Sequence, residues 1–329
     1  YNVFMFASLH NIINLIYNEL RHFYFSIAHQ LVVPLRYRVE AKGLENIKND
    51  KGVLYLSNHS SHIDATIITV EVLKWQKDIS IWALDETFKL PYLRWAASHP
   101  KRVKVVKVPN IHQRRSEKHS THLHKLISRT ADRLRAGNNF LIFPSGLCKL
   151  TPLEKIDGKS AIPLLIQQYP EVKIVFVRIT GMWGSRFSYA IKRNQRWSTR
   201  SIRLADLIWQ SFKMLFFNLF LFVPKRKVTL EFVPAPPDFP RFGTRLEINR
   251  YLEKWFNKPW GVQGEPLQRV PDYFWKEKYT DTAYTTTHYQ FNINQVPKPL
   301  RNAIVTMIAN KANLDCKEID FDMHLGRDL

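Results

Sequence analysis

A histidine and an aspartate five positions apart are the residues best suited to acid–base chemistry in this chain. His59 and Asp64 lie in the run NHSSHID, residues 58–64. A histidine base needs a partner on one ring nitrogen, because that partner fixes the tautomer and stabilises the imidazolium that forms on proton transfer. Asp64 could be that partner. The chain has 12 histidines, so the spacing alone is equally compatible with a solvated surface pair.

The flanking residues predict where this pair lies. Residues 52–57 have the pattern of a short buried strand, and residues 65–73 have that of a helix. A turn from a strand into a helix is a usual place for chemistry in α/β sheets. A second apolar strand, residues 139–143, ends in the turn Pro144-Ser145-Gly146.

Together these runs resemble the glycerolipid acyltransferase family, the PlsC-like enzymes, over about residues 40 to 262. Residues 58–64 match the family's NHxxxxD motif completely. The second block resembles residues 83–91 and 105–110, with Lys107 where the family usually has arginine. The third block departs, because residues 143–148 read FPSGLC where most members read FPEGTR.

A narrower branch is indicated by residues 174–188, whose second half, MWGSRFS, resembles 2-acylglycerophosphoethanolamine acyltransferases fused to carrier-protein and acyl-activating domains. In that branch a glutamate downstream of the proline-glycine turn is common, and Glu154 is the candidate here. An ordinary surface charge is the alternative for Glu154.

The resemblance implies acyl transfer from a thioester to an alcohol. His59 would be the general base on the acceptor hydroxyl, Asp64 would hold the ring, and backbone N–H groups near Ser145 and Gly146 would stabilise the oxyanion. No covalent enzyme intermediate is required. A nucleophilic Ser60 or Ser61 is a weaker alternative, because adjacent side chains rarely point at each other, and His62 is expected to be supporting or solvated.

The expected acceptor is a lysophospholipid such as lysophosphatidylethanolamine. Lysophosphatidate, or acylation of an aminolipid, is the alternative, since arginine forks suit a terminal phosphate and the family's arginine position is Cys148. The residues expected to bind substrates are Asn58, Lys107, Ser145, Gly146, Glu154, Arg178 and Arg186.

The charge balance predicts an acidic partner. The chain has 49 Lys and Arg against 28 Asp and Glu, a net charge of +21. Anionic lipid headgroups, an acidic carrier protein and nucleic acid all fit such a charge. Because no nucleic-acid-binding motif is recognised in the sequence, we do not expect the chain to bind nucleic acid.

An apolar run at residues 214–223 has basic residues on both sides. It is about half the roughly 20 residues needed to span a bilayer, which favours insertion into the membrane interface; a buried core helix is the alternative. Residues 1–40 are expected to form similar amphipathic helices. No secretory signal is evident, so we expect peripheral attachment at the cytoplasmic face of the membrane.

The alternation of strand and helix patterns predicts an α/β fold, with a mostly parallel sheet flanked by helices. The acyltransferase domain is expected at residues 41–262, a strap and linker at 263–295, and a partial carrier-like segment at 296–329. A long basic helix over residues 114–136, capped by Gly137, is expected to present a solvated face; docking of a carrier protein or lipid is the alternative. Further elements are expected as strands at 80–84, 103–108, 172–179 and 227–233 and helices at 91–98 and 244–256.

The last residues, 316–329, resemble an acyl carrier protein just before its prosthetic-group serine. We therefore expect a longer polypeptide whose own carrier delivers the acyl group, with acyl-CoA as the alternative donor and no cofactor held by these residues, since the phosphopantetheine serine is absent from them. Cys148 and Cys316 give no disulfide framework and no metal spacing, so no metal is expected. The rival function is a non-catalytic module for carrier docking or membrane binding.

Overall fold

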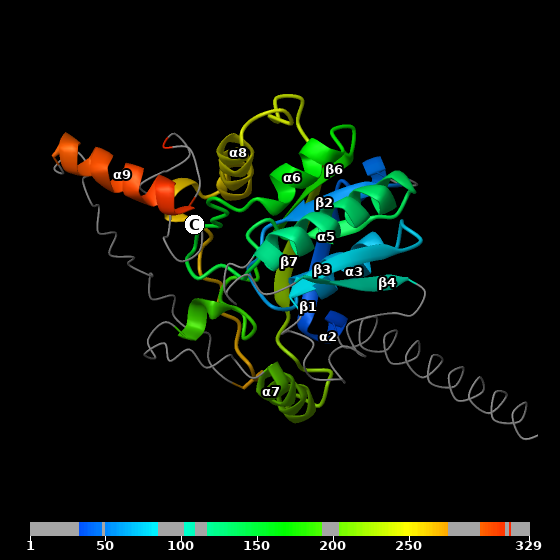
Figure 1. Ribbon diagram of the computed structural model, residues 1–329. Helices are drawn as coiled ribbons and strands as arrows, with labels where there is room; N and C mark the ends of the chain where they lie inside the picture. The colour runs from blue at the N-terminus through cyan, green and yellow to red at the C-terminus, as the bar shows by residue number, and fades with distance from the viewer. Residues whose placement is uncertain are drawn as a thin grey trace, which may run out of the picture.

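A seven-stranded sheet forms the centre of the computed structural model, which describes residues 33–47, 50–84, 102–108, 117–192, 204–275, 297–312 and 316 (Figure 1). The strands follow the order β1-β7-β6-β2-β5-β3-β4 across the sheet. Their bounds are β1 Tyr37–Lys42, β2 Val53–Ser57, β3 Ile79–Leu84, β4 Val103–Val108, β5 Phe140–Ile142, β6 Lys173–Thr180 and β7 Arg226–Pro234.

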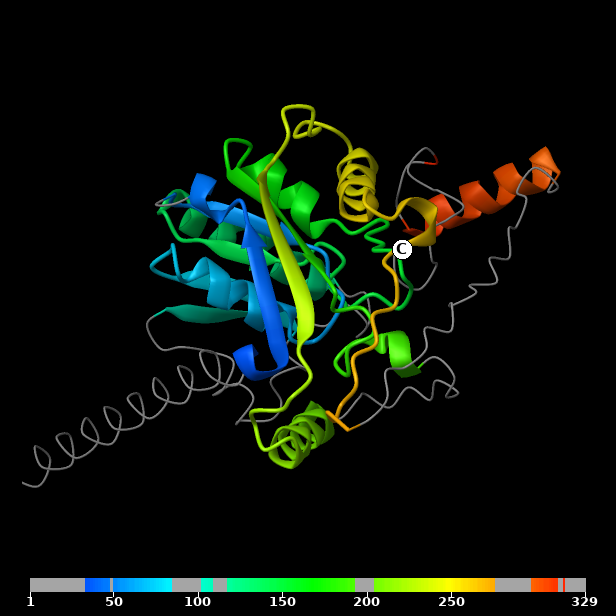
Figure 2. The same ribbon diagram turned by 180° about the vertical axis from the view of Figure 1, so that it is seen from behind.

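The sheet is mixed but mostly parallel, as predicted. Five neighbouring strands, β6, β2, β5, β3 and β4, are parallel, whereas β7 runs antiparallel to β6 and β1 runs parallel to β7. Figure 2 shows β1 and β7 side by side at one edge. The prediction that residues 37–40 belong to N-terminal helices was wrong, because they form most of β1.

Helices cover both faces of the sheet. On one face, α3 (Asp64–Val72) packs on Val53 and Tyr55. On the other, α5 (Glu117–Arg135), α6 (Ala161–Gln168) and α8 (Arg245–Asn257) pack on Leu54 and Leu56. Alternate side chains of β2 thus enter opposite cores, as a strand buried on both faces requires.

Helix ends follow the local sequence. The basic helix α5 stops before Gly137, whose φ of 88° is in the left-handed region that glycine tolerates. At the start of α8, Thr244 and Glu247 form a reciprocal capping box. Sequence analysis did not predict α6.

Helix α7 (Leu204–Phe217) lies at the end of the molecule near α2 (Val33–Arg36), away from α8 (Figures 1 and 2). Met214 and Leu215 pack with Val223 and Leu35 in a small separate core. Eight other large apolar side chains here are exposed: Trp209, Phe212, Phe216, Phe217, Leu219, Phe220, Leu221 and Phe222. None of the described helices is both long and apolar enough to cross a bilayer.

Short 3-10 helices are η2 (Leu44–Ile47), η4 (Tyr189–Lys192) and η5 (Gly261–Gln263). The first part of the predicted carrier-like segment, residues 296–329, contains a helix, α9 (Lys298–Ala312). Several predictions lie outside the described residues: the helices before residue 33, the helix at 91–98, the linker at 276–295 and nearly all of the carrier-like run after residue 316.

Candidate active site

Three loops meet at the carboxyl ends of neighbouring strands. Strand β2 lies between β5 and β6 and is parallel to both. The loops that follow these strands, residues 58–63, 143–160 and 181–188, therefore emerge at the same edge of the sheet. Backbone bonds join them directly, because Lys149 N–H donates to the His59 carbonyl (2.7 Å) and His62 N–H donates to the Phe187 carbonyl (3.1 Å).

His59 and Asp64 form the predicted pair. His59 Nδ1 lies 3.2 Å from Asp64 Oδ2. Asp64 is fully buried and also accepts hydrogen bonds from the backbone N–H (2.7 Å) and the hydroxyl of Ser61. The Phe143 ring stacks on the imidazole, with centroids 4.0 Å apart and an interplanar angle of 21°. The ring is therefore fixed in plane and tautomer, with Nε2 left for chemistry.

Cys148 faces that second nitrogen. Its Sγ lies 3.4 Å from His59 Nε2, 3.7 Å from His59 Nδ1 and 3.7 Å from His62 Nδ1. Burial disfavours the charged ring, but the Cys148 sulfur and the hydrogen bond with Asp64 outweigh it and raise the pKa of His59 well above its ordinary value. Burial also disfavours a thiolate, but His59 and then His62 outweigh it and lower the pKa of Cys148.

Glu154 lies beside the catalytic loop, buried, and is not a surface charge. Its Oε2 accepts the backbone N–H of His59 at 3.1 Å. The side-chain amide of Asn257 on α8 accepts the backbone N–H of Glu154 and donates to the Glu154 carbonyl, each at 2.9 Å. Burial raises the pKa of Glu154, although nearby Lys149 lowers it in part. The structure thus gives Glu154 a positioning role for His59 and not the predicted contact with substrate.

Asn58 is likewise a positioning residue. Its side-chain amide donates to the Ile179 carbonyl (2.9 Å) and accepts the Ile179 N–H (2.8 Å). The side chain is almost fully buried, so it extends the pairing of β2 with β6 by one step. We therefore correct the prediction that Asn58 binds substrate.

Ser145 and Gly146 form a turn between β5 and Cys148. Gly146 has a φ of 69° and its N–H donates to the Phe143 carbonyl at 2.9 Å. The Ser145 hydroxyl donates to the Leu147 carbonyl at 3.1 Å. The Gly146 N–H is therefore occupied and does not serve as the predicted oxyanion donor. Within the described part of the chain, the backbone N–H of Cys148 has no partner.

The predicted basic residues lie apart from His59. Lys107 is exposed on β4, and β5 and β3 separate that strand from β2, a distance of about 14 Å at ordinary strand spacing. Arg178 pairs with Glu231, donates to the Trp255 carbonyl and stacks on the Trp255 ring at 3.9 Å. These contacts hold the Arg178 side chain against β7 and α8, and none of them is with His59, Asp64 or Cys148.

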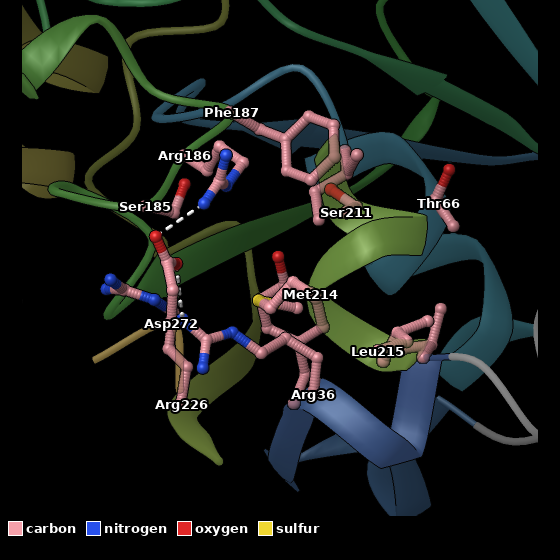
Figure 3. A pocket seen from close by; sticks show the side chains of 13 residues that line it. Arg36, Thr66, Ser185, Arg186, Phe187, Ser211, Met214, Leu215, Arg226 and Asp272 are labelled. Atoms are coloured by element: carbon pink, nitrogen blue, oxygen red, sulfur yellow. Dashed lines mark hydrogen bonds and ion pairs between the residues drawn. The ribbon is translucent and has the colours of Figure 1, made fainter. Parts of the chain in front are cut away.

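Arg186 lines a cavity of about 150 Å³ beside the catalytic loop (Figure 3). On one side of the cavity Arg186 pairs with Asp272. Apolar side chains in the lining come from the loop before α3 (Ile63), the loop after β6 (Phe187) and α7 (Met214 and Leu215), and Arg36 and Arg226 lie beside them. The cavity therefore connects the surroundings of Asp64 with the helix that exposes aromatic side chains.

Sequence analysis missed a buried ion pair that braces these loops. Lys149 Nζ lies 2.6 Å from Glu265 Oε2, and both side chains are 2% exposed. Glu265 also accepts the Ser60 hydroxyl (3.1 Å) and the Gly181 N–H (2.7 Å). A lysine and a glutamate 116 positions apart carry no local pattern, so only the fold reveals their contact.

Part of the chain is similar to known acyltransferases. A family model described as Acyltransferase matches residues 38–179, less than half of the chain. One similar solved structure is the 1-acyl-sn-glycerophosphate (LPA) acyltransferase PlsC from Thermotoga maritima, at 18% identity and a TM-score of 0.42, covering 74% of this chain and 77% of that one. No curated protein sequence matches the chain. The family match includes both His59 with Asp64 and the loop that carries Cys148.

Proposed function

We propose that this chain is an acyltransferase that moves a fatty acyl group from a thioester to the hydroxyl of a lysophospholipid at a membrane surface. The observation that carries the proposal is the His59–Asp64 pair, buried on the Asp64 side, within a region that matches the acyltransferase family model. His59 Nε2 accepts the proton of the acceptor hydroxyl as its oxygen attacks the acyl carbonyl. Asp64 stabilises the imidazolium formed in that step.

The apolar cavity supports a lipid acceptor. Ile63, Phe187, Met214 and Leu215 form apolar parts of its wall, beside Arg36, Arg186 and Arg226, and α7 carries exposed Trp209 and other exposed aromatic side chains. A helix with such a surface lies in the membrane interface with its apolar side chains among the acyl chains. An acceptor would then enter with its chain still partly in lipid. The proposed location is peripheral, on the cytoplasmic face.

The acceptor's headgroup would meet few unpaired cations. Three arginines line the cavity, and each has partners: Arg36 and Arg186 pair with Asp272, and Arg226 donates to two backbone carbonyls. Cys148 stands in place of the family's arginine. A terminal phosphate prefers a two-pronged arginine site. We therefore favour a phosphodiester such as lysophosphatidylethanolamine over lysophosphatidate.

The proposed donor is an acyl carrier protein, with acyl-CoA as the second choice. The chain's net charge of +21 suits an acidic carrier, and α5 exposes Lys125 and Arg129 as one basic surface. A carrier tethered in the same polypeptide would raise the local donor concentration to the millimolar range for short linkers.

An acyl-transfer assay tests this function directly. The chain is mixed with palmitoyl-acyl carrier protein or palmitoyl-CoA and with a panel of lysophospholipids and aminolipids in vesicles. Turnover should be highest with lysophosphatidylethanolamine and should fall at least about 10³-fold in His59→Ala.

The outcomes separate the rival readings. Highest turnover with lysophosphatidate would correct the acceptor but keep the reaction. No turnover with any pair, from a folded chain that binds vesicles, would refute the enzyme and favour a docking module.

A further inference from the structure

Cys148, His59 and Asp64 have the geometry of a nucleophile, its base and the residue that orients the base. Cys148 Sγ lies 3.4 Å from His59 Nε2 and 3.7 Å from His59 Nδ1, and Asp64 Oδ2 lies 3.2 Å from Nδ1, so the thiol contacts the imidazole that the carboxylate orients. That order of contacts defines an activated nucleophile. The thiol also lies 3.7 Å from His62, which places a second imidazole beside it.

We propose that Cys148 is a catalytic nucleophile and that acyl transfer passes through a thioester between the acyl group and Cys148. This inference rests on the proposed acyl transfer and adds a covalent step to it. In this scheme Cys148 reacts first, with the donor thioester. The lipid hydroxyl reacts second, and it gives its proton to His59 Nε2.

In the first step, the Cys148 thiolate attacks the carbonyl carbon of the donor thioester. The carbon–sulfur bond to the donor then breaks, and the protonated His59 gives its proton to the departing sulfur. The acyl group is now on Cys148, the donor leaves as a thiol, and His59 is neutral. Attack and release exchange one thioester for another, so no oxidant or reductant is needed.

In the second step, neutral His59 accepts the proton of the lysophospholipid hydroxyl while its oxygen attacks the acyl-Cys148 carbonyl. The bond between Cys148 and the acyl group breaks, which forms the ester and regenerates the thiolate beside protonated His59. The two charge states of His59 thus serve the two steps in turn, because acylation removes the thiolate that favours protonation.

The surroundings fit this chemistry. Both shifts described for the resting site, a lowered pKa for Cys148 and a raised one for His59, favour a thiolate beside an imidazolium. The backbone N–H of Cys148, without a partner among the described residues, is available to the oxyanion of either tetrahedral intermediate. Cys148 is 5% exposed as a residue, and the His59 side chain is 16% exposed, so substrates approach along the open edge of the imidazole.

Trapping the acyl group tests the inference. The full chain is mixed with palmitoyl-CoA or palmitoyl-acyl carrier protein without acceptor, quenched within one turnover and weighed by mass spectrometry. One palmitoyl group should be found on the peptide that contains Cys148, and neutral hydroxylamine should release it. Lysophosphatidylethanolamine added before the quench should discharge it into product at least as fast as overall turnover.

The variants make the test specific. Cys148→Ala should lose the adduct and at least about 10³-fold of kcat, with a circular dichroism spectrum like that of the wild type. Cys316→Ala removes the chain's other cysteine, which is exposed, and should keep both adduct and activity. His59→Ala should also lose the adduct, since the thiol then has no base.

Each outcome decides one question. Product without an adduct, or Cys148→Ala with at least about a tenth of wild-type kcat, would overturn the covalent step and leave the acyltransferase standing. An adduct on Cys148 that no lysophospholipid discharges would uphold the nucleophile and refute the proposed acceptor. Neither adduct nor product would refute both.

Discussion

Asp64 sets the charge that His59 can carry. It is fully buried, and it accepts two hydrogen bonds from Ser61 besides its contact with His59. Asp64→Asn keeps the shape of the side chain but removes the charge that stabilises the imidazolium, so kcat should fall about 10²- to 10⁴-fold. Steady-state kinetics would measure this. Ser61→Ala, which removes one bond to Asp64 and no charge, should cost far less; equal losses would contradict the electrostatic role.

Glu154 should make stability depend on pH with a definite sign. Burial raises its folded pKa above the ordinary value that it has when unfolded. As the pH rises, the unfolded chain therefore releases the Glu154 proton before the folded chain does. The contribution of this group to the free energy of unfolding is present at low pH and is lost as the pH rises from the unfolded pKa through the folded pKa.

Glu154→Gln has no such titration and retains an acceptor for the His59 N–H. Relative to wild type, the variant's free energy of unfolding should therefore increase between about pH 4 and about pH 7. Urea denaturation at the two pH values would measure it. A difference that stays constant, or that falls, would contradict the raised pKa.

The contact between His59 and Asp64 could be predicted from the sequence, but the neighbours that hold this pair could not. His59 and Asp64 lie in one short run, so their spacing carries the signal. Asn58 and Glu154 were identified but given the wrong task, because the sequence does not show that Ile179 or the His59 backbone lies next to them. Arg178 was placed in the site by charge alone, although Glu231 and Trp255 hold it elsewhere.

At the scale of elements, the Lys149–Glu265 pair joins the loop after β5 to the segment after η5. Glu265→Gln would leave the Lys149 charge buried without its partner, which should destabilise the protein by about 3–5 kcal/mol. Lys149→Met combined with Glu265→Gln removes that unpaired charge and should recover part of the loss. Urea unfolding of the single and double variants tests this; a double variant no more stable than Glu265→Gln would refute it.

There are physical reasons why β1 and α6 could not be predicted from the sequence. Strand β1 reads YRVEAK, and its charged residues suit a strand at the edge of the sheet as well as they suit an amphipathic helix. Helix α6 is only eight residues long and contains Pro163 in its first turn, a position that a helix tolerates. By contrast, the central strands β2 and β5 consist almost entirely of apolar residues, and their prediction is confirmed.

For the whole molecule, the exposed apolar surface of α7 and the turn after it should bind membranes. Leu221 is 82% exposed, so Leu221→Asp should leave the fold intact but weaken binding to anionic vesicles at least about tenfold. Phe242→Asp is the matched control. Phe242 is 88% exposed on the loop between β7 and α8, at the other end of the molecule from α7 (Figures 1 and 2). Vesicle sedimentation would measure both, and equal losses would contradict a membrane surface at α7.

The contact between Ser60 and Glu265 spans 205 positions of the chain, and this has a consequence during synthesis. Ribosomes add about 5–20 residues per second, so Glu265 follows Ser60 by roughly 10–40 s. Until then Lys149 lacks its carboxylate and the loop that carries His59 lacks one of its braces. A nascent chain that already contains His59, Asp64 and Cys148 therefore still lacks contacts that hold their loops together, and we expect any activity to appear only after Glu265 has been added.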